Sequence, residues 1–132
     1  MHMLCGFSMP SGGDAVVNGH SIVSELGSVR SVLGLCPQHD ALYPRLSVKQ
    51  HLRLYGALKG VAAHALDASV YSIIRDVALE DKADAKAATL SGGQKRKLSL
   101  AIAFIGDSQV VILDVRNRST AATFVKILID VL

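Results

Sequence analysis

Leu90-Ser91-Gly92-Gly93-Gln94 is the segment from which the architecture of this chain is inferred. Glycines let a backbone come close to another group, and serine is favoured immediately before a helix. The first N–H groups of a helix have no partners within it, and the helix dipole favours negative charge there. We therefore predict a helix that begins after Ser91 and a turn that can hold an anion.

A second informative segment is the apolar run of residues 110–113, which is followed by Asp114. Consecutive Val, Ile and Leu residues are typical of a buried strand, and a carboxylate at the end of such a strand can hold a metal ion. Residues 33–36 form a similar short run, which Pro37 ends. Strands with helices between them indicate an α/β fold.

Composition limits the possible classes of function. The 132 residues suffice for one domain, half of them are hydrophobic and 19% are charged, which predicts apolar surface that a partner or further elements would cover. The net charge of +3 is too small to indicate binding to nucleic acid. No window approaches the ~20 apolar residues of a membrane-spanning helix, and the first residues do not resemble a signal peptide.

Metal-ligand spacing is not visible among the cysteines and histidines. Cys5 and Cys36 are expected to be reduced, buried thiols. The histidines are expected at the surface or in helix caps, and this applies to His20, His39, His51 and His64. The run Lys95-Arg96-Lys97 is expected to be a solvated helix face.

Local patterns predict the secondary structure. Asn18-Gly19 is a typical hairpin turn, and Ser47 with Gln50 forms the pattern of a capping box. A helix opened by Ser91 should bury Leu98, Ala101, Ile102 and Ile105. The expected strands are 14–19, 33–36 and 110–113, and the expected helices are 21–32, 47–59, 66–77, 91–105 and 120–132, with a short helix or loop at 80–89.

Three of these motifs, in this order, resemble the ATP-binding cassette (ABC) family. Cys36-Pro37-Gln38-His39-Asp40 resembles the Q-loop, Leu90 to Gln94 the signature motif, and Val110 to Asp114 the Walker B strand. The resemblance covers residues 3–114. Two further segments are similar to the A subfamily of lipid exporters, Leu46-Ser47-Val48 and Lys95-Arg96-Lys97-Leu98-Ser99.

The resemblance implies a fold and a division of the chain. The expected fold is α/β, a partial P-loop NTPase-like ABC core with an α-helical subdomain. Residues 1–40 would be a part of the core with the Q-loop, and residues 41–90 the helical subdomain. Residues 90–114 would hold the signature helix and Walker B strand, and residues 115–132 a divergent C-terminal helix.

The resemblance also implies ATP and Mg²⁺ as cofactors. In the family, two cassettes enclose ATP, and the signature turn of one covers the γ-phosphate held by the other. The residues of that turn here are Ser91, Gly92, Gly93 and Gln94. Read without the resemblance, Ser91 is only an N-cap and the glycines are only a turn.

Gln38 and Asp114 are the metal-site residues that the resemblance implies. Gln38 would approach Mg²⁺ and the attacking water, and it would also sense the transmembrane partner. Asp114 would hold Mg²⁺ through water at the carboxyl end of its strand, as the Walker B carboxylate does in the family. The ordinary alternatives are a loop glutamine and a strand-terminal aspartate that starts a turn.

Departures from the family pattern affect catalysis. The phosphate-loop motif G-x-x-x-x-G-K-[ST] does not occur in these residues, and Val115 stands where the family has a catalytic glutamate. Residues 116–120 do not resemble the D-loop, and no histidine follows Asp114. We therefore expect this chain to be inactive alone, and slow or absent hydrolysis at its Walker B strand even with a phosphate loop supplied.

These inferences predict part of a nucleotide-binding domain of an A-type ABC transporter, at the cytoplasmic face of a membrane. Its expected partners are a second nucleotide-binding domain and the transmembrane domains, which would contact Gln38 and the region 43–89. Two alternatives stay open. One is a degenerate, non-catalytic cassette remnant, and the other is a soluble ABC ATPase of translation or DNA maintenance.

Overall fold

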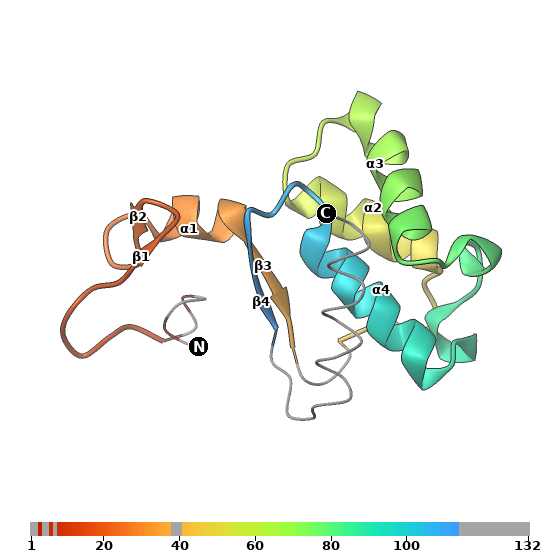
Figure 1. Ribbon diagram of the computed structural model, residues 1–132, viewed down its shortest axis with the longest axis horizontal. Helices are drawn as coiled ribbons and strands as arrows, with labels where there is room; N and C mark the ends of the chain where they lie inside the picture. Colours follow the sequence, from red (N-terminus) through yellow and green to blue (C-terminus); the bar gives the residue numbers. More distant parts are fainter. Residues whose placement is uncertain (1–2, 4–5, 7, 38–40, 114–132) are drawn as a thin grey trace.

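The computed structural model describes residues 3, 6, 8–37 and 41–113 (Figure 1). The predicted helix 120–132 lies outside these residues, and the boundaries proposed at residues 40 and 90 stay predictions. The elements in chain order are β1 (Val16–Val17), β2 (His20–Ser21), α1 (Leu26–Val32), β3 (Leu33–Cys36), α2 (Val48–Leu58), α3 (Ala63–Asp76), the 3₁₀ helices η1 (Glu80–Lys82) and η2 (Ala87–Thr89), α4 (Gly92–Phe104) and β4 (Val110–Leu113).

The first two strands form a tight antiparallel hairpin. Val17 pairs with His20, so Asn18 and Gly19 alone make the turn. Their φ angles are 48° and 84°, and positive φ at both central residues is the geometry of a type I′ turn. The predicted Asn-Gly turn is confirmed.

Helix α1 begins at Leu26, later than the predicted start at residue 21. The Ser21 hydroxyl accepts hydrogen bonds from the Val23 and Ser24 N–H groups, both at 3.1 Å. A serine side chain that bonds nearby backbone in this way competes with helix formation. The prediction of a helix was therefore wrong for residues 21–25.

Ser47 caps α2 as predicted. The Gln50 N–H donates to Ser47 Oγ at 3.2 Å, and the Ser47 N–H donates to Gln50 Oε1 at 2.8 Å. Both bonds of a capping box are present, so two N–H groups at the start of the helix are satisfied. After the last turn Gly60 adopts a φ of 83°, which ends the helix.

Strands β3 and β4 pair in parallel, with Leu33 opposite Val110 and Cys36 opposite Leu113. A parallel pair needs a long crossover, and here the crossover contains α2, α3 and α4. Figure 1 shows α4 between the β3–β4 pair and the α2–α3 pair. The two strands therefore end at one edge of the sheet.

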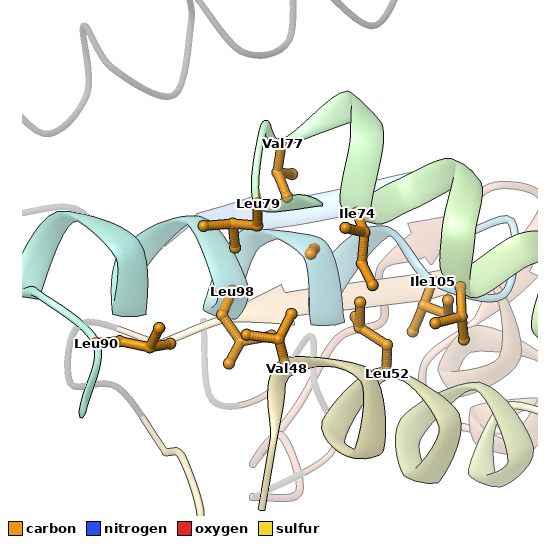
Figure 2. Packing of buried hydrophobic residues seen from close by; sticks show 10 residues of the cluster. Val48, Leu52, Ile74, Val77, Leu79, Leu90, Leu98 and Ile105 are labelled. Carbon is orange, nitrogen blue, oxygen red and sulfur yellow. The ribbon is translucent and has the colours of Figure 1, made fainter. Parts of the chain in front are cut away.

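The larger hydrophobic core joins the helical elements. Figure 2 shows Val48 and Leu52 of α2 facing side chains from α3 and α4. Apolar residues at helical spacing on α2, α3 and α4 thus pack together in one interior cluster. The buried members are Val48, Leu52, Val70, Ile74, Val77, Leu79, Leu90, Leu98, Ala101 and Ile105.

Helix α4 has a second buried face that the sequence pattern did not indicate. Leu100 and Ala103 pack with Cys36 against the sheet, while Leu98 and Ala101 face α2 and α3. The predicted single face was therefore incomplete, because a helix enclosed on both sides loses the clean periodicity of a surface helix. The predicted burial of the Cys36 thiol is confirmed, and Cys5 lies outside the described residues.

Candidate functional site

The turn at residues 91–94 is fixed by a second capping box. The Gln94 N–H donates to Ser91 Oγ at 3.3 Å, and the Ser91 N–H donates to Gln94 Oε1 at 2.9 Å. The predicted N-cap at Ser91 is confirmed. Because the cap uses only an oxygen lone pair, the Ser91 hydroxyl keeps its proton to donate to another group.

Gly92 and Gly93 leave open space outside the helix. A Cβ atom added at either residue would meet no atom within 4 Å, and neither residue has a positive φ. Packing and backbone conformation within the described chain therefore do not require glycine at these positions. Ser91, Gly92 and Gly93 are all exposed, so the turn is open to a group from outside the chain.

The N-terminal end of α4 lies at the edge where the parallel strands end. Arg96 Nη1 donates to the backbone oxygen of Pro37 at 2.6 Å, next to the end of β3. Further along α4, the Ala103 carbonyl approaches Gly34, so the helix runs antiparallel to β3. The register places the carboxyl end of β4 beside that of β3.

The predicted metal-site residues follow these strand ends in sequence. Gln38 comes two residues after Cys36, and Asp114 comes directly after Leu113. Gln38, Asp114 and Val115 lie outside the described residues. The parallel register nonetheless shows that the chain leaves both strands at one sheet edge, which is where ligands bind in open α/β sheets.

Arg96 differs from the solvated residue that the sequence predicted. Its side chain is half-buried and reaches the Pro37 carbonyl. Arg96 precedes Leu100 by four residues and Ala103 by seven, which places it on the sheet-facing side of α4. The spacing of Arg96 from Leu100 and Ala103 was the sequence signal for its partly buried position. It could be interpreted only once Leu100 and Ala103 were known to face the sheet.

His51 is fully buried rather than at the surface. Its Nδ1 lies 2.8 Å from the Ser47 carbonyl oxygen, and its Nε2 accepts the Tyr43 N–H at 2.9 Å. A backbone N–H can only donate and a carbonyl can only accept, so these contacts select the neutral ring with the proton on Nδ1. His51 therefore ties the segment after Gln38 to the start of α2.

Lys59, directly after α2, is hydrogen-bonded to the end of α4 and to the loop before β4. Its ammonium donates to the Ala103 carbonyl at 2.9 Å and to Ser108 Oγ at 2.5 Å. The first bond satisfies a carbonyl in the last turn of α4, and the second holds the loop that leads into β4. Burial lowers the pKa of Lys59 to about 8 from its ordinary value of 10.5.

This shifted pKa predicts that stability rises with pH between about 8 and 10.5. In that interval the unfolded chain binds the proton at Lys59 more often than the folded chain does, so raising the pH favours folding. Below pH 8 both states are protonated and this contribution is constant. Urea midpoints at pH 7, 8, 9 and 10 measure the effect, and Lys59→Met should remove the rise. A rise that persists in Lys59→Met would assign it to another group.

Neither a metal-ligand cluster nor a membrane-spanning helix occurs among the described residues. Within residues 8–37 and 41–113, no group of three His, Cys, Asp or Glu side chains could hold a metal ion. Across the same part of the chain, every helix is too short or too polar to cross a membrane.

Comparison with known sequences decides the family. The sequence profile of the ABC transporter family matches residues 1–115. The chain belongs to the ABC transporter family. Among ABC relatives, it is 46% identical over 114 residues to ATP-binding cassette sub-family A member 7 of Rattus norvegicus, and 44% identical over 114 residues to the human protein named phospholipid-transporting ATPase ABCA7. The resemblance to the A subfamily is therefore confirmed.

The aligned region is most of this chain but a small part of each relative. Each alignment covers 86% of this chain but only 5% of the relative, so the chain spans a small part of the ABC proteins that it matches. Among solved structures, cbiO1 from Clostridium perfringens, described as part of the ABC transporter complex cbiONQ, superposes with a TM-score of 0.82. At 21% identity, covering 98% of this chain and 55% of cbiO1, this likeness confirms the predicted partial α/β ABC fold.

Proposed function

We propose that this chain works as part of the nucleotide-binding domain of an A-type ABC transporter, and that its 91–94 turn covers the γ-phosphate of ATP held by a second cassette. The observation that supports this most strongly is the open space at Gly92 and Gly93. Two adjacent glycines that no internal contact requires are explained by an external group that needs the room. The family match supports a nucleotide phosphate as that group.

The chemistry of the turn suits a phosphate. The Gly93 N–H and the Ser91 hydroxyl would donate to phosphate oxygens, and the dipole of the 13-residue helix α4 favours negative charge at this end. The Gln94 side chain holds the turn through its bond to the Ser91 N–H. The turn can thus bind a phosphate with little reorganisation.

Gln38 and Asp114 are proposed to hold Mg²⁺ at the shared strand edge. An amide oxygen and a carboxylate oxygen are ligands that Mg²⁺ accepts, and the ion bound to ATP would neutralise phosphate charge. The β3–β4 register supports this assignment, because it brings the residues before both side chains to one edge. Val115 offers no carboxylate to activate water.

The proposed partners are the second nucleotide-binding domain and the transmembrane domains, with the chain at the cytoplasmic face of the membrane. Exposed apolar side chains near α2 and α3 support a docking role for the helical region: Tyr43, Leu54, Leu58 and Tyr71. The human relative is named as a phospholipid-transporting ATPase, so a lipid is the proposed cargo.

Gly93→Asp tests the proposed turn. An aspartate side chain fits the open space, but its charge repels a phosphate, so ATP-dependent association with an intact A-subfamily cassette should weaken about tenfold, the equivalent of ~1.4 kcal/mol. Binding is measured by interferometry with and without Mg-ATP. Gly12→Asp is the matched control, because Gly12 also has open space and should stay within about twofold of the parent. Equal binding by the two variants would refute the proposed phosphate contact.

A non-catalytic role is the second candidate, and Val115 favours it. A remnant would bind an intact cassette through the 91–94 turn without supporting hydrolysis at its own Walker B strand. The two candidates share the binding step and differ in turnover. Substitution at Val115 therefore separates them.

A further inference from the structure

The sheet-facing side of α4 places one cation at the exit of β3. Arg96 lies a single turn before Leu100, and its guanidinium donates to Pro37 O at 2.6 Å. Proline has no N–H, so its carbonyl is the only backbone group with which Pro37 can be anchored. A hydrogen bond from a charged donor is stronger than a neutral one, which makes this anchor a firm one.

The chain that follows Pro37 is anchored a second time, to residues that precede the 91–94 turn. The Ala88 N–H donates to the Pro44 carbonyl at 3.1 Å, and the Ala87 N–H donates to the Leu46 carbonyl at 2.9 Å. Ser47 also forms a bridge with Lys86. Residues 44–47 are therefore bonded to residues 86–88, which lead directly into the 91–94 turn.

These two sets of bonds bracket the region between Pro37 and Tyr43. On one side Arg96, two residues after Gln94, holds Pro37, and on the other side residues 86–88 hold Pro44 and Leu46. Both anchors come from chain that immediately flanks the 91–94 turn. The 91–94 turn is therefore linked, through hydrogen bonds of the residues that flank it, to both ends of the region that contains Gln38.

We propose that Arg96 is a positioning residue that holds the exit of β3 in register with the 91–94 turn. The consequence of this role of Arg96 rests on the proposed function. A phosphate bound at the 91–94 turn of one cassette would change the position of the segment after Pro37. That segment serves the other nucleotide site of the pair. Arg96 touches no nucleotide in this role. It acts through the Pro37 carbonyl.

Amide hydrogen exchange of the 132-residue chain without nucleotide tests the anchor. Arg96→Met should speed exchange in the peptide covering residues 37–46 at least about tenfold, because the hydrogen bond from a charged donor to the Pro37 carbonyl is lost. Arg96→Lys keeps a cation that can reach a carbonyl and should restore most of the protection. Lys95→Met is the control, since it removes the neighbouring positive charge of the same helix.

Peptides from α3 report whether each variant is folded, because Val70 and Ile74 of α3 belong to the helical core and not to the contact between Arg96 and Pro37. Unchanged exchange in α3 with faster exchange at 37–46 supports the anchor. Equal exchange at 37–46 in Arg96→Met and Lys95→Met would overturn it. Equal acceleration everywhere in Arg96→Met, without rescue by Arg96→Lys, would also overturn it, because it would show a general loss of stability.

A second comparison adds Mg-ATP and an intact cassette. In the parent chain, protection should increase at 91–97 and also at 37–46, whereas in Arg96→Met it should increase at 91–97 alone. Protection of both regions in Arg96→Met would overturn the proposed transmission. Absence of protection at 91–97 in the parent would instead refute the proposed function, and the nucleotide-free result would still decide the role of Arg96.

Discussion

Replacement of Gly34 by alanine is expected to lower the free energy of unfolding by about 3 kcal/mol, at the upper end of the effects of overpacking. A Cβ atom at this position would lie 2.0 Å from the Ala103 carbonyl oxygen and 2.9 Å from its carbon. These are backbone atoms of α4, which is held on its other face by the helical core. Relief of the clash would have to move α4 away from β3.

Gly27→Ala is the matched control for Gly34→Ala. Gly27 lies in α1, and a Cβ atom there would meet nothing within 4 Å. Alanine favours a helix over glycine by up to ~1 kcal/mol, so this variant should be as stable as the parent or more stable. Urea unfolding followed by circular dichroism measures both. Similar midpoints for the two variants would show that α4 does not pack on β3 as described.

Val115→Glu is expected to raise ATP turnover about 100-fold in a cassette that joins this chain to the phosphate loop of an A-subfamily relative. A general base contributes roughly 10²–10⁴-fold to such a reaction, and valine cannot accept a proton. Release of inorganic phosphate at saturating Mg-ATP measures turnover, with a second intact cassette present.

Val115→Gln is the control for that substitution. Glutamine has nearly the shape of glutamate but cannot take a proton from water, so its turnover should stay near that of the parent. Turnover as fast with valine as with glutamate would contradict the proposed role of this position in activating water. Slow turnover with valine, together with ATP-dependent association, would favour the non-catalytic candidate.

Local residue choices made several elements predictable. Ser47 with Gln50 and Ser91 with Gln94 each form the two bonds of a capping box. Asn18-Gly19 makes the expected turn. These features depend on residues at most three positions apart, so their energetics are contained in short windows of sequence. The family motifs were recognisable for a related reason, since each is a short segment with its own chemistry.

Contacts between distant segments were not predictable in the same way. His51 was expected at the surface or in a cap, yet it is buried because the loop at Tyr43 folds over it. Arg96 was expected in solvent, yet it reaches a carbonyl 59 positions earlier in the chain. No local pattern distinguishes a lysine or arginine that finds such a partner from one that does not.

The amino-acid sequence alone was sufficient to establish the caps, the strands 33–36 and 110–113, and the motifs that mark an ABC chain. The parallel register, the two buried faces of α4 and the anchors made by Arg96 and Lys59 arise only on folding. Local elements follow from backbone propensities and hydrogen bonds to near neighbours. The site depends on which faces pack together, and that choice is made by burying apolar surface across segments far apart in the chain.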